Sequence, residues 1–200
     1  MLMTTATTSS LPLKMTQHAS AGYLELILGC MFSGKTTKLL EIYNMYRICD
    51  VECCVVNYDK DKRYHSELLS THDKKMIPCI NVKNLGEVAT QENIDKYDVF
   101  LINEGQFFVD VYEVVLDLVE NHGKKVYVCG LDGDYKQQTF GKLLNLIPHC
   151  DNYNKLHAIC KNCKDGTPAA FSKRITSETY QEVIGSDNYI PVCRKCYISI

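Results

Sequence analysis

The sequence lacks any apolar run approaching the roughly 20 residues that a membrane-spanning helix needs, so we expect no transmembrane segment and no membrane partner. It also lacks a charge excess, because 22 Lys and Arg stand against 24 Asp and Glu, for a net charge of −2. This balance argues against a general nucleic-acid binder. With 200 residues, 46% of them hydrophobic, the chain has ample material for one large domain, or for one domain with a small appendage.

The first 22 residues lack acidic side chains and have only one strong base, Lys14. They contain neither the apolar core of a secretory signal nor the arginines of a mitochondrial one. We therefore expect a disordered leader, residues 1–22, on a cytoplasmic protein. An organelle-targeting role is the alternative.

A glycine-rich loop of the form G-x-x-x-x-G-K-T is the most informative segment. It consists of Gly29, Cys30, Met31, Phe32, Ser33, Gly34, Lys35 and Thr36. An apolar, strand-like run precedes it and an amphipathic helical pattern follows it. Glycines let successive N–H groups face an anion, the helix adds its positive end, and Lys35 supplies a cation. Thr36 would offer its hydroxyl to Mg²⁺, so the segment predicts a phosphate-binding loop (P-loop) that binds a nucleotide.

Further apolar runs at residues 53–56, 99–102 and 126–129 alternate with helical patterns. This order predicts an α/β fold like that of P-loop NTPases, with a parallel sheet flanked by helices. We expect helices over residues 109–120, stopped by Gly123, and over residues 141–146. Residues 59–81 are polar and weakly periodic, which indicates a mobile loop over the nucleotide site. After His149 the pattern changes, so we expect a nucleotide-binding domain at 23–149 and a second module at 150–200.

Eleven cysteines without a secretory signal are typical of reduced thiols and metal ligands. Cys160, Cys163, Cys193 and Cys196 form two C-x-x-C pairs, whose four thiolates suit a closed, structural Zn²⁺ site. The other seven cysteines are interpreted as small buried hydrophobic residues. Four unrelated buried thiols are the alternative interpretation of the two pairs.

The strand predicted at 99–102 ends in Asn103 and Glu104. P-loop enzymes usually place a Mg²⁺-binding Asp here, and Asn103 replaces it. Glu104 is the candidate general base, because the carboxyl end of a parallel sheet lies beside the P-loop. A solvated strand-end Glu is the alternative. Phe107 and Phe108 could stack on a planar base, although core packing competes with that interpretation.

Six motifs in order resemble thymidine kinase of the cellular and poxvirus type over about residues 23–197. The motifs are the P-loop, N-E-G-Q-F-F, Gly130 to Gly133, Phe140-Gly141, Lys173-Arg174 and the run from Val183 through Gly185 to Tyr189. The resemblance implies transfer of the γ-phosphate of ATP to the 5′-hydroxyl of thymidine, with Mg²⁺, by an α/β domain and a small zinc-binding lasso domain. It also implies a homotetramer and feedback inhibition by thymidine triphosphate (dTTP).

The resemblance also assigns roles to residues. Glu104 matches the proton acceptor, and the four paired cysteines match the zinc ligands. The ATP-binding set adds Asp61, Arg63, Asn103 and Gln106 to the P-loop. The thymidine-binding set comprises Met31, Phe107, Leu131, Tyr135, Phe140, Gln181, Glu182, Val183, Ile184, Gly185 and Tyr189.

Three residues depart from the family pattern, and two alternative interpretations accompany this one. Cys30 stands where the family has Pro, and Tyr135 where relatives often have Phe. Asn103 removes the negative charge that attracts Mg²⁺, so a catalytically impaired nucleotide-binding homologue is the main alternative. A zinc-ribbon ATPase acting on nucleic acid is the other, against which residues 151–200 show no strong basic excess.

Overall fold

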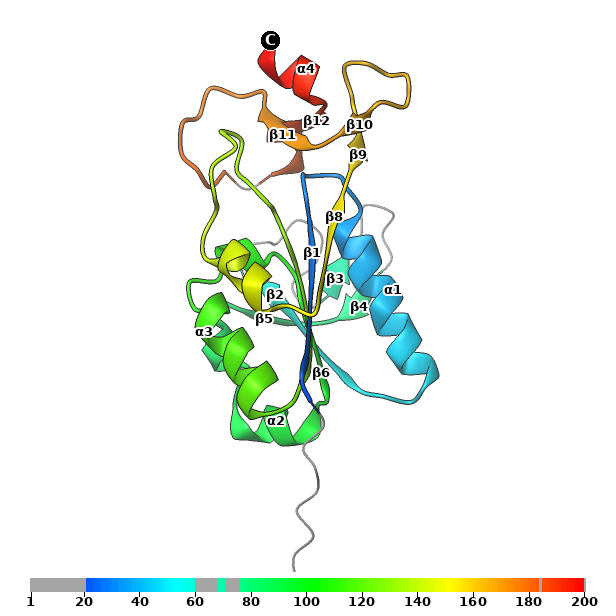
Figure 1. Ribbon diagram of the computed structural model, residues 1–200, viewed down its shortest axis with the longest axis vertical. Helices are drawn as coiled ribbons and strands as arrows, with labels where there is room; N and C mark the ends of the chain where they lie inside the picture. The colour runs from blue at the N-terminus through cyan, green and yellow to red at the C-terminus, as the bar shows by residue number, and fades with distance from the viewer. Residues whose placement is uncertain (1–20, 60–67, 71–75, 184, 200) are drawn as a thin grey trace, which may run out of the picture.

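A six-stranded, all-parallel sheet in the order β5-β2-β6-β7-β1-β8 forms the centre of the protein, as shown by a computed structural model (Figure 1). The structure describes residues 21–59, 68–70, 76–183 and 185–199. The sheet strands are β1 (Tyr23–Gly29), β2 (Cys53–Tyr58), β5 (Ile80–Val82), β6 (Val99–Ile102), β7 (Lys125–Gly130) and β8 (Asn152–Leu156). The predicted α/β class with a parallel sheet is confirmed.

Helices cover both faces of this sheet (Figure 1). Helix α1 (Lys35–Ile48) packs on one face, and α2 (Gln91–Lys96) and α3 (Val111–Leu116) pack on the other. Side chains of β6 alternate between the two: Val99 and Leu101 join the α1 cluster, and Phe100 and Ile102 join the α3 cluster. All of β6 is therefore buried, which explains why it appears in the sequence as a continuous apolar run.

The predicted helix at 109–120 corresponds to α3 and the π-helical turn Asp117–Asn121 that continues it. Gly123, with φ of 62°, follows as expected of a helix stop. The helix expected at 141–146 is a 3-10 helix, Leu143–His149. Shorter 3-10 turns occur at Leu85–Glu87, Gly105–Phe107 and Ser186–Asn188.

The expectation of a loop throughout 59–81 was wrong for its described part. Strands β3 (Leu68–Ser70) and β4 (Met76–Pro78) pair antiparallel, and β5 joins the main sheet. Leu69 and Ile77 are buried in the α1 cluster. Strands of three residues are too short to show alternation in the sequence, so tertiary packing decides their structure.

The predicted lasso domain, a name kept below for the segment from β9 onward, lies beyond the carboxyl ends of the sheet strands (Figure 1). It contains β9 (Ala158–Ile159), β10 (Pro168–Ala169), β11 (Phe171–Arg174), β12 (Tyr189–Val192) and α4 (Arg194–Ile198). Strands β9 and β10 pair antiparallel, as do β11 and β12. The division at 149/150 stays a prediction, with β8 belonging to the parallel sheet. The predicted leader, 1–22, lies almost entirely outside the described residues.

Within the described ranges, no helix has both the length and the apolar character needed to cross a bilayer.

Candidate active site

The P-loop connects β1 to α1 as the sequence predicts. Gly34 adopts a left-handed conformation, with φ of 83°, immediately before the first helical residue, Lys35. The Lys35 side chain is largely buried, and its Nζ donates a hydrogen bond to the Cys30 carbonyl at 2.8 Å. The ammonium group is therefore held over the loop, where an anion would lie.

Glu104 follows β6 in a left-handed conformation, with φ of 55°, which is rare for a residue other than glycine. Its Oε2 accepts a hydrogen bond of 2.6 Å from Nε2 of Gln106. Gln106 is 2% exposed, and its Oε1 accepts from the Leu131 N–H at 3.0 Å. A Cβ at Gly130 would come within 2.5 Å of that same oxygen, so a larger residue there would displace the Gln106 amide. The Gln106 amide thus fixes the carboxylate of Glu104 against the end of β7.

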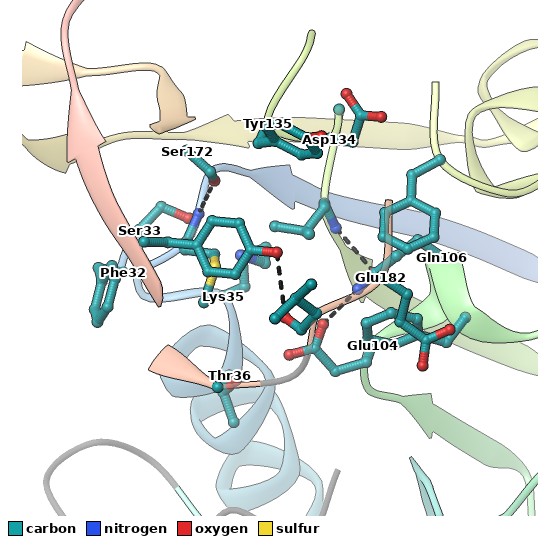
Figure 2. A pocket seen from close by; sticks show the side chains of 18 of the residues that line it. Phe32, Ser33, Lys35, Thr36, Glu104, Gln106, Asp134, Tyr135, Ser172 and Glu182 are labelled. Atoms are coloured by element: carbon teal, nitrogen blue, oxygen red, sulfur yellow. Dashed lines mark hydrogen bonds between the residues drawn. The ribbon is translucent and has the colours of Figure 1, made fainter. Parts of the chain in front are cut away.

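A pocket opens between the P-loop, the end of β6 and the lasso domain (Figure 2). Predicted site residues that line it are Met31, Phe32, Ser33, Gly34, Lys35, Thr36, Glu104, Gln106, Phe107, Leu131, Tyr135, Phe140, Gln181, Glu182, Val183, Gly185 and Tyr189. Four lining residues were not predicted: Thr37, Gly133, Asp134 and Ser172. Asp134 follows the noted Gly130 to Gly133 motif directly, so that motif carried a signal for it, whereas Ser172 is brought in only by the tertiary fold.

An aromatic wall bounds one side of this pocket. Phe107 stacks on Tyr58 with ring centroids 5.0 Å apart, and it meets Phe140 edge-on at 5.2 Å. Phe108, by contrast, is fully buried in the α3 cluster and contacts Tyr58 edge-on. Of the two aromatic residues suggested for base stacking, only Phe107 lines the pocket.

Asn103 is buried, with 2% of its surface exposed, and does not line the pocket. Its Oδ1 accepts from Thr36 Oγ1 at 3.4 Å and from Cys129 Sγ at 3.0 Å. Burial raises the pKa of Cys129 to about 12, so the thiol keeps its proton and acts as donor. The Asn103 Nδ2 donates to Asn57 Oδ1 at 2.8 Å, and Asn57 in turn donates to Asn81 at 3.0 Å. A chain of neutral amides therefore leads to the hydroxyl of Thr36.

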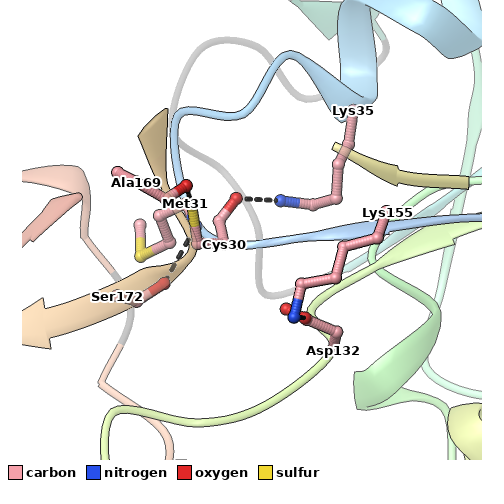
Figure 3. A network of polar contacts seen from close by, with 7 residues as sticks. All are labelled: Cys30, Met31, Lys35, Asp132, Lys155, Ala169 and Ser172. Carbon is pink, nitrogen blue, oxygen red and sulfur yellow. Dashed lines mark hydrogen bonds and ion pairs between the residues drawn. The ribbon is translucent and has the colours of Figure 1, made fainter. Parts of the chain in front are cut away.

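The P-loop is also bonded to the lasso domain (Figure 3). The Cys30 thiol donates to the Ala169 carbonyl at 3.3 Å, and the Met31 N–H donates to Ser172 Oγ at 2.9 Å. Burial raises the pKa of the Cys30 thiol, which favours this neutral donor form. Nearby, Lys155 of β8 pairs with Asp132 at 2.5 Å. The contacts with Ala169 and Ser172 hold the P-loop against β10 and β11.

The four paired cysteines come together at one end of the lasso domain. Their sulfur atoms lie within 4.8 Å of one another, and Cys163 Sγ is 3.7 Å from Cys193 Sγ and 3.5 Å from Cys196 Sγ. Thiolates around a tetrahedral Zn²⁺ at about 2.3 Å would lie about 3.8 Å apart, so the geometry fits a Cys₄ zinc site. Burial opposes ionisation of Cys160, but N–H groups of Cys193, Cys163 and Asn162 outweigh it and lower its pKa to about 6.

A family model described as "Thymidine kinase" matches residues 22–197. The chain belongs to the thymidine kinase family. The thymidine kinase of Yaba monkey tumor virus (strain VR587) is 42% identical over 184 residues, which are 92% of this chain and 98% of that protein. The thymidine kinase of Sheeppox virus (strain KS-1) is 42% identical over 88% of this chain and 97% of its own length. That of Vaccinia virus (strain Western Reserve) is 41% identical over 90% and 98%.

Membership of the thymidine kinase family confirms the resemblance expected from the motifs and makes this chain a phosphotransferase. Three described residues of the predicted ATP-binding set lie outside the pocket lining: Gly29, which ends β1, and the buried Cys30 and Asn103. Asp61, Arg63 and Ile184 lie outside the described residues. The expectation that the seven scattered cysteines are buried holds for Cys30, Cys54 and Cys129 alone. Cys53, Cys79 and Cys150 are partly exposed, and Cys49 is exposed.

Proposed function

We propose that this chain transfers the γ-phosphate of ATP to the 5′-hydroxyl of thymidine, forming thymidine monophosphate and ADP. The observation that carries the proposal is that three features line one pocket: the P-loop with Lys35, the carboxylate of Glu104, and the aromatic wall that includes Phe107. Figure 2 shows Lys35 and Glu104 in this pocket. Similarity to proteins named thymidine kinase over about nine tenths of the chain supports the choice of nucleoside.

The phosphate end of the reaction is assigned to the P-loop. Backbone N–H groups and Lys35 would hold the triphosphate and stabilise the charge that builds up on the transferred group. Asp61 and Arg63 belong to this end by family resemblance. The Thr36 hydroxyl is the group that we assign to holding Mg²⁺ bound with ATP, and the ion would supply positive charge against the phosphates.

The acceptor end is assigned to Glu104. The thymidine 5′-oxygen attacks the γ-phosphorus, the bond to the bridging oxygen of ADP breaks, and the hydroxyl proton passes to the Glu104 carboxylate. Gln106 orients that carboxylate through the 2.6 Å hydrogen bond. Phe107, Leu131, Tyr135 and Phe140 would enclose the base, with the backbone of the 181–185 segment supplying hydrogen bonds.

Four further properties complete the proposal. The Cys₄ cluster would hold Zn²⁺ as a structural ion with no open position for substrate. We also propose a homotetramer, feedback inhibition by dTTP, and a cytoplasmic location.

The test is a Mg²⁺-ATP phosphorylation assay with thymidine, deoxycytidine, deoxyadenosine and deoxyguanosine in parallel. Thymidine-selective transfer is expected, and Glu104→Gln should lower kcat by roughly 10²- to 10⁴-fold with little change in the KM for thymidine. Absence of transfer to every nucleoside, with ATP still bound, would instead support the catalytically impaired homologue that Asn103 suggests.

A further inference from the structure

The connection between β11 and β12, residues 175–188, forms part of the pocket although it has little regular structure. Its described side chains from 175 to 181 are all exposed, and residues 175–183 belong to no helix or strand. One backbone hydrogen bond, from the Ile175 N–H to the Asn188 carbonyl at 2.9 Å, closes its base. Nevertheless Gln181, Glu182 and Val183 line the pocket. The shape of this loop must therefore come from side chains that bind its backbone.

Arg174, the last residue of β11, is the centre of these contacts. It is 8% exposed, and its guanidinium donates to the carbonyl oxygens of Glu178 at 3.0 Å, Gln181 at 3.1 Å and Tyr180. It also donates to the hydroxyl of Tyr189, and that hydroxyl donates in turn to the Val183 carbonyl at 3.2 Å. All these acceptors are neutral oxygens, and the planar fork of Arg matches several of them at once.

Aromatic stacking holds the guanidinium in place. Its central carbon lies 3.7 Å from the centroid of the Tyr135 ring and 5.0 Å from that of Tyr189. The Tyr135 hydroxyl donates to the Thr179 carbonyl at 2.9 Å, and the Tyr135 carbonyl accepts from Tyr197 at 2.7 Å. The loop is thus wrapped around Arg174 and tied to the segment that follows β7.

We propose that Arg174 is a positioning residue that shapes the 175–188 loop into the nucleoside-side wall of the pocket. The inference rests on the proposed thymidine kinase function. Arg174 would act on the nucleoside indirectly, by holding the loop backbone and Tyr189 in place. Among the described residues, Arg174 contacts the loop, Tyr135 and Tyr189, whereas the P-loop is bonded to Ser172 and Ala169. Loss of these contacts should therefore affect thymidine and leave ATP unaffected.

The kinetic test compares Arg174→Lys with Lys173→Gln. Lysine keeps the charge but lacks the planar fork, so the KM for thymidine should rise at least about tenfold, with kcat and the KM for ATP changed less than about threefold. Lys173 lies on the opposite face of β11, where its Nζ donates to the Tyr197 carbonyl, so Lys173→Gln is the control for a change in the same strand and should shift both KM values less than about threefold. Equal rises in both KM values, a fall in kcat alone, or no change would overturn the proposal.

Tyr135→Phe provides a second variant that keeps the ring over Arg174 and removes only the bond to Thr179. It should raise the KM for thymidine about two- to tenfold. An unchanged KM would contradict the proposal that these hydrogen bonds shape the 175–188 loop, even if Arg174→Lys fails to fold.

A structural readout separates this proposal from the proposed function. Tyr180 is 78% exposed while its carbonyl is bound by Arg174, so chymotryptic cleavage after Tyr180 should be several-fold faster in Arg174→Lys than in Lys173→Gln. If the natural protein transfers no phosphate to thymidine, the proposed function fails, and the cleavage rates alone decide the role of Arg174. Equal cleavage rates would overturn it.

Discussion

Replacing Asn103 with Asp should not improve this enzyme, although Asp is the usual residue at this position of P-loop enzymes. Asn103 Nδ2 donates to Asn57 Oδ1 at 2.8 Å, and a carboxylate there would place two acceptor oxygens against each other. Asn57 could turn its amide to donate instead, but its nitrogen already donates to Asn81 Oδ1 at 3.0 Å. Either arrangement breaks one bond in the amide chain.

The structure also sets the size of this effect. Leaving a buried polar group without its partner costs about 1 to 3 kcal/mol. In a chain of this size one kcal/mol corresponds to about 2 to 4 °C in Tm, so Asn103→Asp should lower the Tm by about 2 to 12 °C. Burial raises the pKa of a carboxylic acid above its unfolded value of about 3.9. The penalty should therefore be small near pH 4, grow as the pH rises through the folded pKa, and be complete at pH 8.

The assay is thermal unfolding of Asn103→Asp and the natural protein at several pH values between 4 and 8, combined with kcat in Mg²⁺-ATP. We expect a Tm difference that widens toward pH 8 and a kcat no higher than that of the natural protein. A Tm difference independent of pH would refute the argument from the amide chain. A rise in kcat by several orders of magnitude would show that Asn103 impairs the natural enzyme.

Two further predictions concern Gln106 and the cysteine cluster. Gln106→Leu removes the donor to Glu104 and the acceptor for the Leu131 N–H, so kcat should fall roughly tenfold with the KM for thymidine nearly unchanged, and equal effects on both would contradict the orienting role. Purified protein should contain about one zinc per chain, and a chelator that removes it should speed proteolysis of the lasso domain and raise the KM values for both ATP and thymidine. Retention of all three properties after zinc loss would contradict a structural role.

Local sequence was sufficient to predict the phosphate end of the site. The P-loop is a continuous segment, and its strand, its glycines and its helix each have a local signature, so its geometry followed from the sequence. Buried strands such as β6 were equally clear, because both faces of a parallel sheet are covered and the sequence shows an unbroken apolar run. The two C-x-x-C pairs were clear because that spacing is typical of tetrahedral zinc sites.

Contacts between distant segments could not be predicted in this way. The hydrogen bond from Asn103 to Asn57 and that from Gln106 to the Leu131 N–H join residues 46 and 25 positions apart. Nothing in the local pattern distinguishes a strand-end Asn that faces a metal from one that donates to a neighbouring strand. The short strands β3 and β4 were not predicted for a related reason, because tertiary packing rather than sequence periodicity determines them.

Strand β11 connects the cysteine cluster with both ends of the pocket. Ser172 and Arg174 are two residues apart and both buried, as expected for side chains on one face of a strand. Ser172 binds the P-loop backbone through Met31, whereas Arg174 binds the 175–188 loop. Strand β12, which pairs with β11, leads directly into the cluster at Cys193. Metal loss should therefore raise the KM values for both ATP and thymidine, whereas Arg174→Lys should raise the KM for thymidine alone. This contrast separates the role of strand β11, which serves both ends of the pocket, from the role of the 175–188 loop, which serves the thymidine end.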